Sequence, residues 1–151
     1  MMNQDTAFAR QAIQELAARY SDALNQRNWQ SFNSCWMWGS IYKVQGPTSI
    51  EKKGLEAISA EAKAALGQME TFFNVTHPGV IEVFGREAKA RFPVTEYRHL
   101  IGAGRRTTVL GFYEDELKWA MTGQWVFEKR TFTVVYSEDT APKIGPVQVR
   151  A

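Results

Sequence analysis

The hydrophobic pattern divides the chain into a helical first part and a β-rich second part. Apolar side chains recur every three or four positions between residues 5 and 25, which predicts an amphipathic helix. A shorter helix with Asn28 as its cap is predicted over residues 29–36, and a longer helix over residues 50–66. A short strand, residues 40–45, is predicted between these two helices.

The pattern changes after residue 68, because β-branched and aromatic residues dominate and no helical period persists. The strands predicted in this part are 71–76, 79–84, 87–100, 107–119 and 124–137. Pro93 lies inside a long predicted strand, which indicates either a bulge or an edge position. Such a bulge would turn Tyr97 and His99 towards the inside.

Helices followed by a run of strands with short turns are typical of the α+β class, with the helices on one face of an antiparallel sheet. Long strands with a proline kink favour a sheet that curves around the helices and leaves a pocket beside the first helix. We expect one domain over residues 1–151, with its core at 7–137 and an extended tail at 138–151.

Composition narrows the possible partners. The chain has 151 residues, and 13% of them are aromatic, which indicates a thick core or a lined cavity. A net charge of +2 is too small for strong attraction to nucleic acid or to an anionic membrane, so we expect neither as a partner. Cys35 is the only cysteine, and the first residues lack a secretory-signal pattern, which together favour a cytoplasmic location.

Few residues in the chain are candidates for a catalytic or metal-binding role. Two histidines and one cysteine without an HExxH motif give no set of metal ligands. His77 ends a predicted strand and is a candidate base, although a partly exposed histidine is the common alternative. Arg130 shares a strand face with apolar residues and needs an acceptor. Glu128 on that face would make a structural pair, whereas an anion-binding role is the alternative.

Three segments carry a family pattern: AIQELAARYSDALNQRNW, FFNVTHPGVIEVFGREAKA and GFYEDELKWAMTGQWVFEKR. In this order and at this spacing they resemble the SnoaL-like proteins of the nuclear transport factor 2-like superfamily. The resemblance covers residues 7–137 and implies a cone-shaped α+β fold, in which helices pack on a curved, mostly antiparallel sheet that encloses a pocket.

Within that superfamily, the chain is most similar to the branch of scytalone dehydratase, bile acid dehydratase and hexachlorocyclohexane dehydrochlorinase. These enzymes remove a proton and a leaving group across a carbon–carbon bond without a metal or an organic cofactor. The resemblance implies a histidine base at His77, a site tyrosine at Tyr20 and an assisting arginine at Arg130. Asn25 stands where the family has an aspartate that orients the histidine. An asparagine orients a ring by hydrogen bonding but supplies no charge.

We therefore expect a lyase or isomerase that uses no cofactor and acts on a small hydrophobic cyclic molecule by proton abstraction at His77. The alternatives are a pocket that binds such a ligand without turnover, and a protein-interaction domain. The residues expected to line the pocket are Tyr42, Trp36, Trp38, His99 and Tyr113.

The predicted strand 124–137 carries apolar residues on both of its faces. Trp125 and Phe127 share one parity, whereas Phe132, Val134 and Tyr136 share the other. Since only one face of the strand packs against the helices, the apolar residues on the other face would be exposed unless a second chain buried them. We therefore expect a homodimer formed through the outer face of the sheet.

Overall fold

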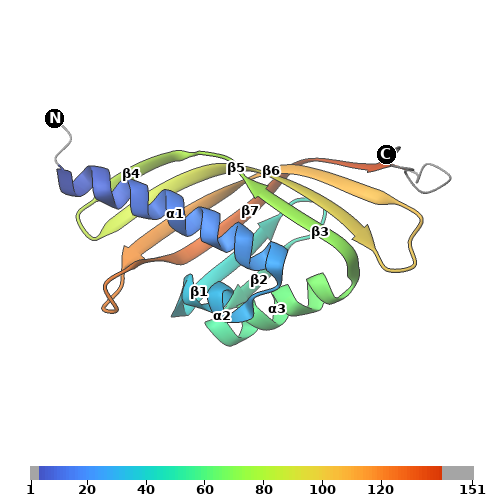
Figure 1. Ribbon diagram of the computed structural model, residues 1–151, viewed down its shortest axis with the longest axis horizontal. Helices are drawn as coiled ribbons and strands as arrows, with labels where there is room; N and C mark the ends of the chain where they lie inside the picture. The colour runs from blue at the N-terminus through green and yellow to red at the C-terminus, as the bar shows by residue number, and fades with distance from the viewer. Residues whose placement is uncertain (1–3, 141–151) are drawn as a thin grey trace, which may run out of the picture.

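The computed structural model describes residues 4–140 and has three helices on one face of a curved sheet (Figure 1). In chain order the elements are α1 (Gln4–Gln26), α2 (Trp29–Ser34), β1 (Trp36–Gln45), β2 (Ile50–Lys53), α3 (Leu55–Gly67), β3 (Met69–Thr76), β4 (Val80–Phe84), β5 (Glu87–Leu100), β6 (Arg106–Trp119) and β7 (Trp125–Thr140). The expected α+β class is confirmed. None of the helices within the described range is long and apolar enough to cross a membrane.

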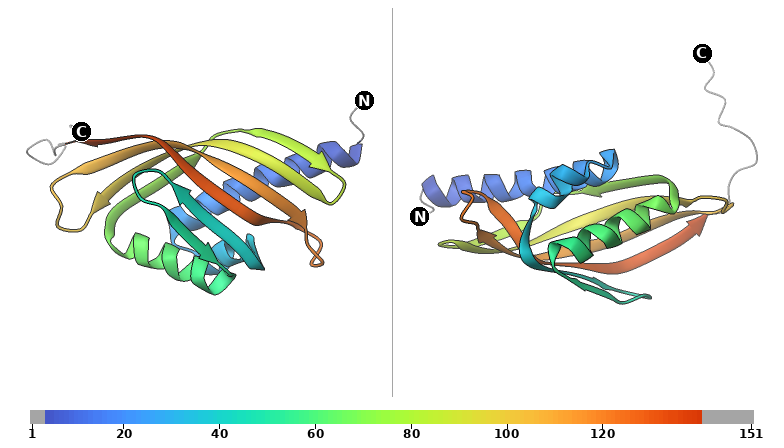
Figure 2. Two further views of the ribbon diagram at one scale, coloured as in Figure 1. Left: turned by 180° about the vertical axis from the view of Figure 1, so that it is seen from behind. Right: turned by 90° about the horizontal axis from the view of Figure 1, so that it is seen from below.

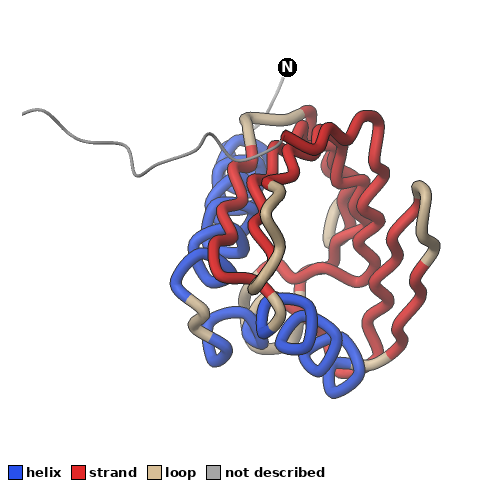
Figure 3. Tube along the Cα trace, turned by 90° about the vertical axis from the view of Figure 1, so that its right-hand side faces the viewer, coloured by secondary structure: helices blue, strands red, loops and turns tan. Residues whose placement is uncertain are grey.

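The seven-stranded sheet has the order β2-β1-β7-β6-β5-β3, and β4 also pairs with β5. The pair β1–β7 is parallel and the other pairs are antiparallel. The helices lie on the concave side of the sheet (Figure 2). Seen from the end, the strands curve around two sides of the molecule and the helices close the others (Figure 3).

Three predicted boundaries differ from the structure by three residues or more. Residues 50–53 form β2 rather than the start of a helix, and α3 begins after Gly54, whose φ of 92° suits glycine. Residues 36–39 belong to β1, whereas the strand was predicted to begin at residue 40 and the short helix to reach residue 36. Asn28 does cap α2, because its side chain accepts from the Ser31 backbone N–H at 3.1 Å. Residues 138–140 continue β7, and the rest of the predicted tail lies outside the described residues.

The bulge expected at Pro93 is wrong. The β5–β6 register runs through Pro93 without a shift, so the alternation of faces continues along β5. The backbone N and C=O of one residue in an antiparallel strand point to the same side. On the side to which the Pro93 C=O points, the β4 pairing ends at Arg91 and the β3 pairing begins at Val94. The absence of a backbone N–H at Pro93 therefore costs little folding free energy.

Register shifts occur instead between β6 and β7, and one of them lies between Glu116 and Leu117. This shift lets β7 change the parity that faces inwards. Phe127, Arg130 and Phe132 are all buried as a result. Trp125 and Phe127 on one parity of β7 and Phe132 on the other thus serve one inner face, whereas Tyr136 is 49% exposed on the outer face.

Candidate functional site

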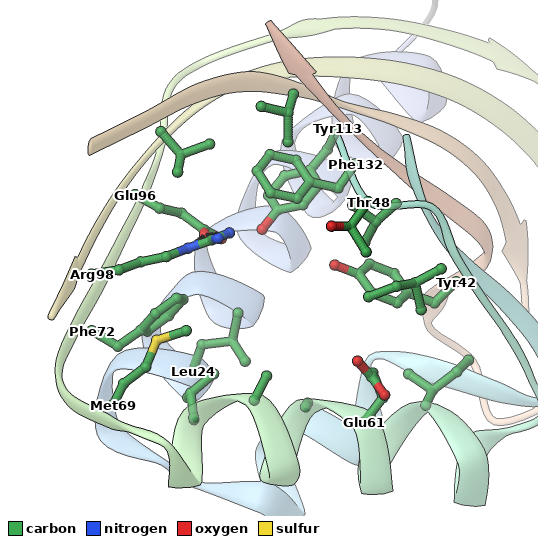
Figure 4. A pocket seen from close by; sticks show the side chains of 18 of the residues that line it. Leu24, Tyr42, Thr48, Glu61, Met69, Phe72, Glu96, Arg98, Tyr113 and Phe132 are labelled. Carbon is green, nitrogen blue, oxygen red and sulfur yellow. Dashed lines mark hydrogen bonds and ion pairs between the residues drawn. The ribbon is translucent and has the colours of Figure 1, made fainter. Parts of the chain in front are cut away.

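A cavity of about 430 Å³ lies between the inner face of the sheet, the carboxyl-terminal half of α1 and α3 (Figure 4). Most of its wall is apolar, with Leu24, Phe72 and Phe132 among the lining side chains. The polar side chains that reach it are Tyr20, Tyr42, Thr48, Glu61, Glu96, Arg98, Tyr113 and Ser137. An apolar cavity with a few polar groups is the usual form of a small-molecule site.

A buried polar network connects β3, β5 and β6 at the cavity wall. The Asn74 side chain, 1% exposed, donates from Nδ2 to Glu96 Oε1 at 3.0 Å and to the Tyr113 hydroxyl oxygen at 2.8 Å. The Ser21 hydroxyl donates to Asn74 Oδ1 at 2.6 Å. Arg98 donates to Glu96 Oε2 from Nε at 2.9 Å and from Nη2 at 2.5 Å. Glu96 accepts three of these bonds, one from Asn74 and two from Arg98, an arrangement that stabilises a carboxylate.

The three tyrosines at the cavity remain neutral over the physiological range. Burial is the largest cause that raises the pKa of the Tyr20 and Tyr113 hydroxyls well above the ordinary value. Burial likewise raises the pKa of Tyr42, and the Glu96 carboxylate raises it further. A protonated phenol is a hydrogen-bond donor and a poor base.

Arg130 lies outside the cavity lining and is fully buried. Its Nε donates to Asp115 Oδ1 at 2.8 Å and its Nη2 to Asp115 Oδ2 at 3.1 Å. The guanidinium carbon also lies 3.7 Å from the Tyr113 ring centroid. A structural pair was one of the two expected roles, but the partner is not Glu128, which instead lies 2.9 Å from Lys118 Nζ.

The predicted pairing of Asn25 with His77 is wrong. Asn25 Nδ2 donates to the Asn74 backbone oxygen at 2.9 Å, and Asn25 Oδ1 accepts from the Asn74 backbone N–H at 2.7 Å. The exposed His77 ring lies 3.1 Å from the Thr95 hydroxyl, which belongs to the outer parity of β5. The β3 side chain that joins the polar network beside Asn25 is Asn74.

The alternation of β3 explains this mistake. Phe72, Asn74 and Thr76 share the inward parity, whereas His77 has the outward parity. Adjacent phenylalanines, Phe72 and Phe73, leave no hydrophobic contrast between the two faces, so the sequence alone did not show which face was buried.

Sequence reasoning also missed Glu96, Arg98 and Glu61. Glu96 shares its parity with the buried Phe92 and Val94, which was an available signal. With a bulge at Pro93, the prediction assigned the inward face to the opposite parity, and so to His99 instead of Glu96. Glu61 lies one residue before Ala62, an apolar position of the helical stripe, where nothing in the sequence distinguishes it from a solvent-facing charge.

The other predicted lining residues divide into two groups. Tyr42 and Tyr113, together with Tyr20, do line the cavity. The remaining three do not. Trp36 is buried in the aromatic core, with its ring 5.5 Å from the Phe127 ring. Trp38 is 82% exposed, and His99 Nε2 lies 2.9 Å from the Ala103 backbone oxygen. Within residues 4–140, no group of three His, Cys, Asp or Glu side chains is arranged to hold a metal ion.

Comparisons with known proteins support the same architecture. The profile of the SnoaL-like domain family matches residues 5–131. A comparison with curated protein sequences gives no match.

Solved structures with this fold include three similar proteins. A candidate scytalone dehydratase from Novosphingobium aromaticivorans is 16% identical, with a TM-score of 0.82 over 97% of this chain and 100% of that chain. The hexachlorocyclohexane dehydrochlorinase LinA-type3 from Novosphingobium barchaimii is 19% identical, with a TM-score of 0.82 over 94% and 98%. A candidate aromatic ring hydroxylase from Novosphingobium aromaticivorans is 19% identical, with a TM-score of 0.80 over 89% and 94%. At these identities the likeness establishes the fold.

Proposed function

The chain belongs to the SnoaL-like domain family, and from that premise we propose that its cavity binds a small, largely apolar cyclic molecule. The observation that carries the proposal is the cavity itself, about 430 Å³ with a mainly apolar wall. Its size and its few convergent polar groups suit a ligand of one to three fused rings. The similar structures named for cyclic substrates agree with this class of ligand.

Binding without turnover is the function that the geometry supports best. The two positions that face each other at the end of α1 and on β3 are amides, Asn25 and Asn74, and neither is a base. Glu96 accepts three hydrogen bonds from Asn74 and Arg98, so both of its carboxylate oxygens already have partners in the protein. His77 supplies no base to the cavity, because its exposed ring lies beside Thr95 on the outer parity of β5.

Filling the cavity tests the binding proposal. Ala62 lines the cavity from α3, whereas Ala64 on the same helix is exposed. We expect Ala62→Trp to abolish binding of fluorene, measured by fluorescence titration, because the indole occupies the ligand's volume. Ala64→Trp is the matched control and leaves binding unchanged. Equal binding by both variants would place the ligand elsewhere.

A lyase or isomerase without a cofactor is the second candidate, and Glu61 favours it. This carboxylate rises from α3 into the cavity on the side of Tyr42 (Figure 4). Its only ion pair in the described chain is a loose one, with Glu61 Oε2 3.8 Å from Lys52 Nζ. A carboxylate base and a phenol acid on one cavity are the groups that a proton transfer at carbon requires.

Exchange of carbon-bound protons of cyclic ligands with deuterated water, followed by NMR, measures this activity. We expect Glu61→Gln to remove wild-type exchange and His77→Ala to leave it unchanged. Binding without any wild-type exchange would restrict the function to ligand binding.

We also propose that the chain forms a homodimer through the outer face of the sheet. Two cross-strand pairs there, Phe73–Tyr97 and Leu110–Tyr136, are each 42–51% exposed. Exposed apolar groups of this kind favour an interface. Sedimentation at micromolar concentration measures the state, and Leu110→Asp is expected to give monomers. A wild-type monomer would contradict the proposal.

A further inference from the structure

Three oxygen-bearing side chains face the same part of the cavity. The Glu61 carboxylate rises from α3, the Tyr42 hydroxyl comes from β1, and the Thr48 hydroxyl comes from the turn between β1 and β2 (Figure 4). Glu96 and Arg98 reach the cavity from β5, on its other side. Glu61, Tyr42 and Thr48 therefore form a separate polar group, the oxygen cluster.

The oxygen cluster has hydrogen-bonding capacity that the protein does not use. In the part of the chain that the structure describes, the Tyr42 and Thr48 hydroxyls have no hydrogen-bond partner. Glu61 makes one ion pair with the described residues, in which its Oε2 lies 3.8 Å from Lys52 Nζ. Lys52 is not among the lining residues, so it approaches the carboxylate from outside the cavity. A partly exposed pair at this distance contributes little, and it leaves Glu61 Oε1 available to a ligand.

The charges that line the cavity do not cancel. The lining residues include two carboxylates, Glu61 and Glu96, and one cation, Arg98. Arg98 donates two hydrogen bonds to Glu96, which pairs those two charges with each other. Inside the cavity, Glu61 remains as a negative charge on a mainly apolar wall. A carboxylate in such surroundings is stabilised by a cation that donates hydrogen bonds to it.

We propose that the ligand is a cyclic amine, bound as its ammonium ion by the oxygen cluster. This inference rests on the proposed ligand-binding function and names the chemical class of the ligand. A primary ammonium carries three N–H donors, and the cluster offers three acceptors, the Glu61 carboxylate and the Tyr42 and Thr48 hydroxyl oxygens. The ring system of the ligand lies against the apolar wall, which includes Phe72 and Phe132.

The protonation state of Tyr42 suits this role. Burial is the main cause of the raised pKa of Tyr42, and the Glu96 and Glu61 carboxylates raise it further against two opposing arginines. The hydroxyl therefore stays protonated, so it can accept a hydrogen from an ammonium while it donates its own hydrogen to a carboxylate. An anionic ligand at the same place would meet the Glu61 charge without a free cation on the cavity wall.

Matched ligands separate this inference from the proposed function. Naphthylmethylamine, naphthylmethanol and naphthoate share one ring system and carry an ammonium, a neutral hydroxyl and a carboxylate. The trimethylammonium analogue of the amine keeps the positive charge but has no N–H to donate. Dissociation constants for these ligands are measured by calorimetry with the wild type, Glu61→Gln, Lys52→Met and, as a control, Glu56→Gln at an exposed position of α3.

We expect the wild type to bind the amine about tenfold more tightly than the alcohol, the size of one charge-assisted hydrogen bond. This preference disappears in Glu61→Gln and is kept in Glu56→Gln. Lys52→Met raises the preference about threefold, because the competing lysine ammonium is gone. The trimethylammonium analogue binds more weakly than the primary amine, since it donates no hydrogen bond, and naphthoate binds more weakly than the alcohol.

Two results would overturn the inference. Equal affinity of the wild type for the amine and the alcohol, or an unchanged preference in Glu61→Gln, rejects the amine and leaves the binding function standing. Failure of fluorene and of every naphthalene ligand to bind the wild type rejects both. If Glu61→Gln does not fold, judged by circular dichroism, the wild-type preference and its change in Lys52→Met still decide the question.

Discussion

Two arginine–carboxylate pairs lie on the inner side of the same sheet, and their surroundings differ. The pair of Arg130 with Asp115 has no exposed side-chain surface and lies among aromatic rings. The pair of Glu96 with Arg98 reaches the cavity, and 32% of the Arg98 side chain is exposed. The first pair is enclosed by the core, whereas the second shapes the polar wall of the ligand site.

Charge type alone therefore does not identify a ligand site. Arg130 matched the assisting arginine of the resembled enzymes, yet its hydrogen bonds go to Asp115. Glu96 and Arg98 matched nothing in the resemblance, yet they line the cavity.

Removal of the enclosed arginine has the largest effect. We expect Arg130→Met to lower the free energy of unfolding by about 3–5 kcal/mol, because Asp115 is left buried and charged without its partner. Urea unfolding measures the loss. Arg98→Met is the matched control, with an expected loss of about 1–2 kcal/mol. Equal losses for the two variants would refute the contrast.

We expect the change Asn25→Asp to destabilise the fold and not to create elimination activity. A carboxylate at this position has no hydrogen to donate to the Asn74 backbone oxygen, which now receives one from Asn25 Nδ2. We expect a loss of about 1–3 kcal/mol in unfolding free energy and no gain in elimination from activated cyclic substrates. A gain that disappears on adding His77→Ala would reinstate the histidine mechanism.

The cavity tyrosines predict a stability loss in alkali. Their pKa values are raised in the folded state above the unfolded value of 10.0. Their contribution is therefore complete below about pH 10 and is lost as the pH rises from there towards the folded pKa. Each contributes up to about 1.4 kcal/mol per pH unit in that window. Urea unfolding between about pH 9 and pH 11 should show a shallower decline for Tyr42→Phe than for Tyr97→Phe.

His77→Ala has the smallest expected effect. The ring is exposed and contacts Thr95 on the face away from the cavity. The unfolding free energy should change by less than about 0.5 kcal/mol, and fluorene binding should not change. A tenfold loss of ligand affinity measured by titration would show that the outer face takes part in the site.

The elements with strong periodicity were predictable from the sequence. The stripe of α1, the Asn28 cap and the five later strands follow from local patterns, and the resemblance gave the cone-shaped fold. The inward face of β5 could be inferred from the shared parity of Phe92 and Val94, whereas the inward faces of β3 and β7 were not predictable, since they depend on register. The β6–β7 shift at Glu116 and the uninterrupted alternation through Pro93 are products of pairing between distant strands.

Strand register also determines which residues of the candidate site could be predicted from the sequence. Tyr42 and Tyr113 were expected at the cavity and do line it, because large aromatic residues suit either a core or a cavity wall. Asn74, Glu96 and Glu61 escaped notice because their roles depend on which face they occupy. A single domain over residues 1–151 and a cytoplasmic location stay predictions.

The most direct test of the central claim is an NMR titration of the backbone amides with fluorene. The account predicts shifts that cluster at the cavity, with Leu24, Phe72 and Tyr113 among the residues affected, and none at His77 or Thr95. Shifts centred on His77 and the outer face, with the cavity residues unmoved, would contradict it.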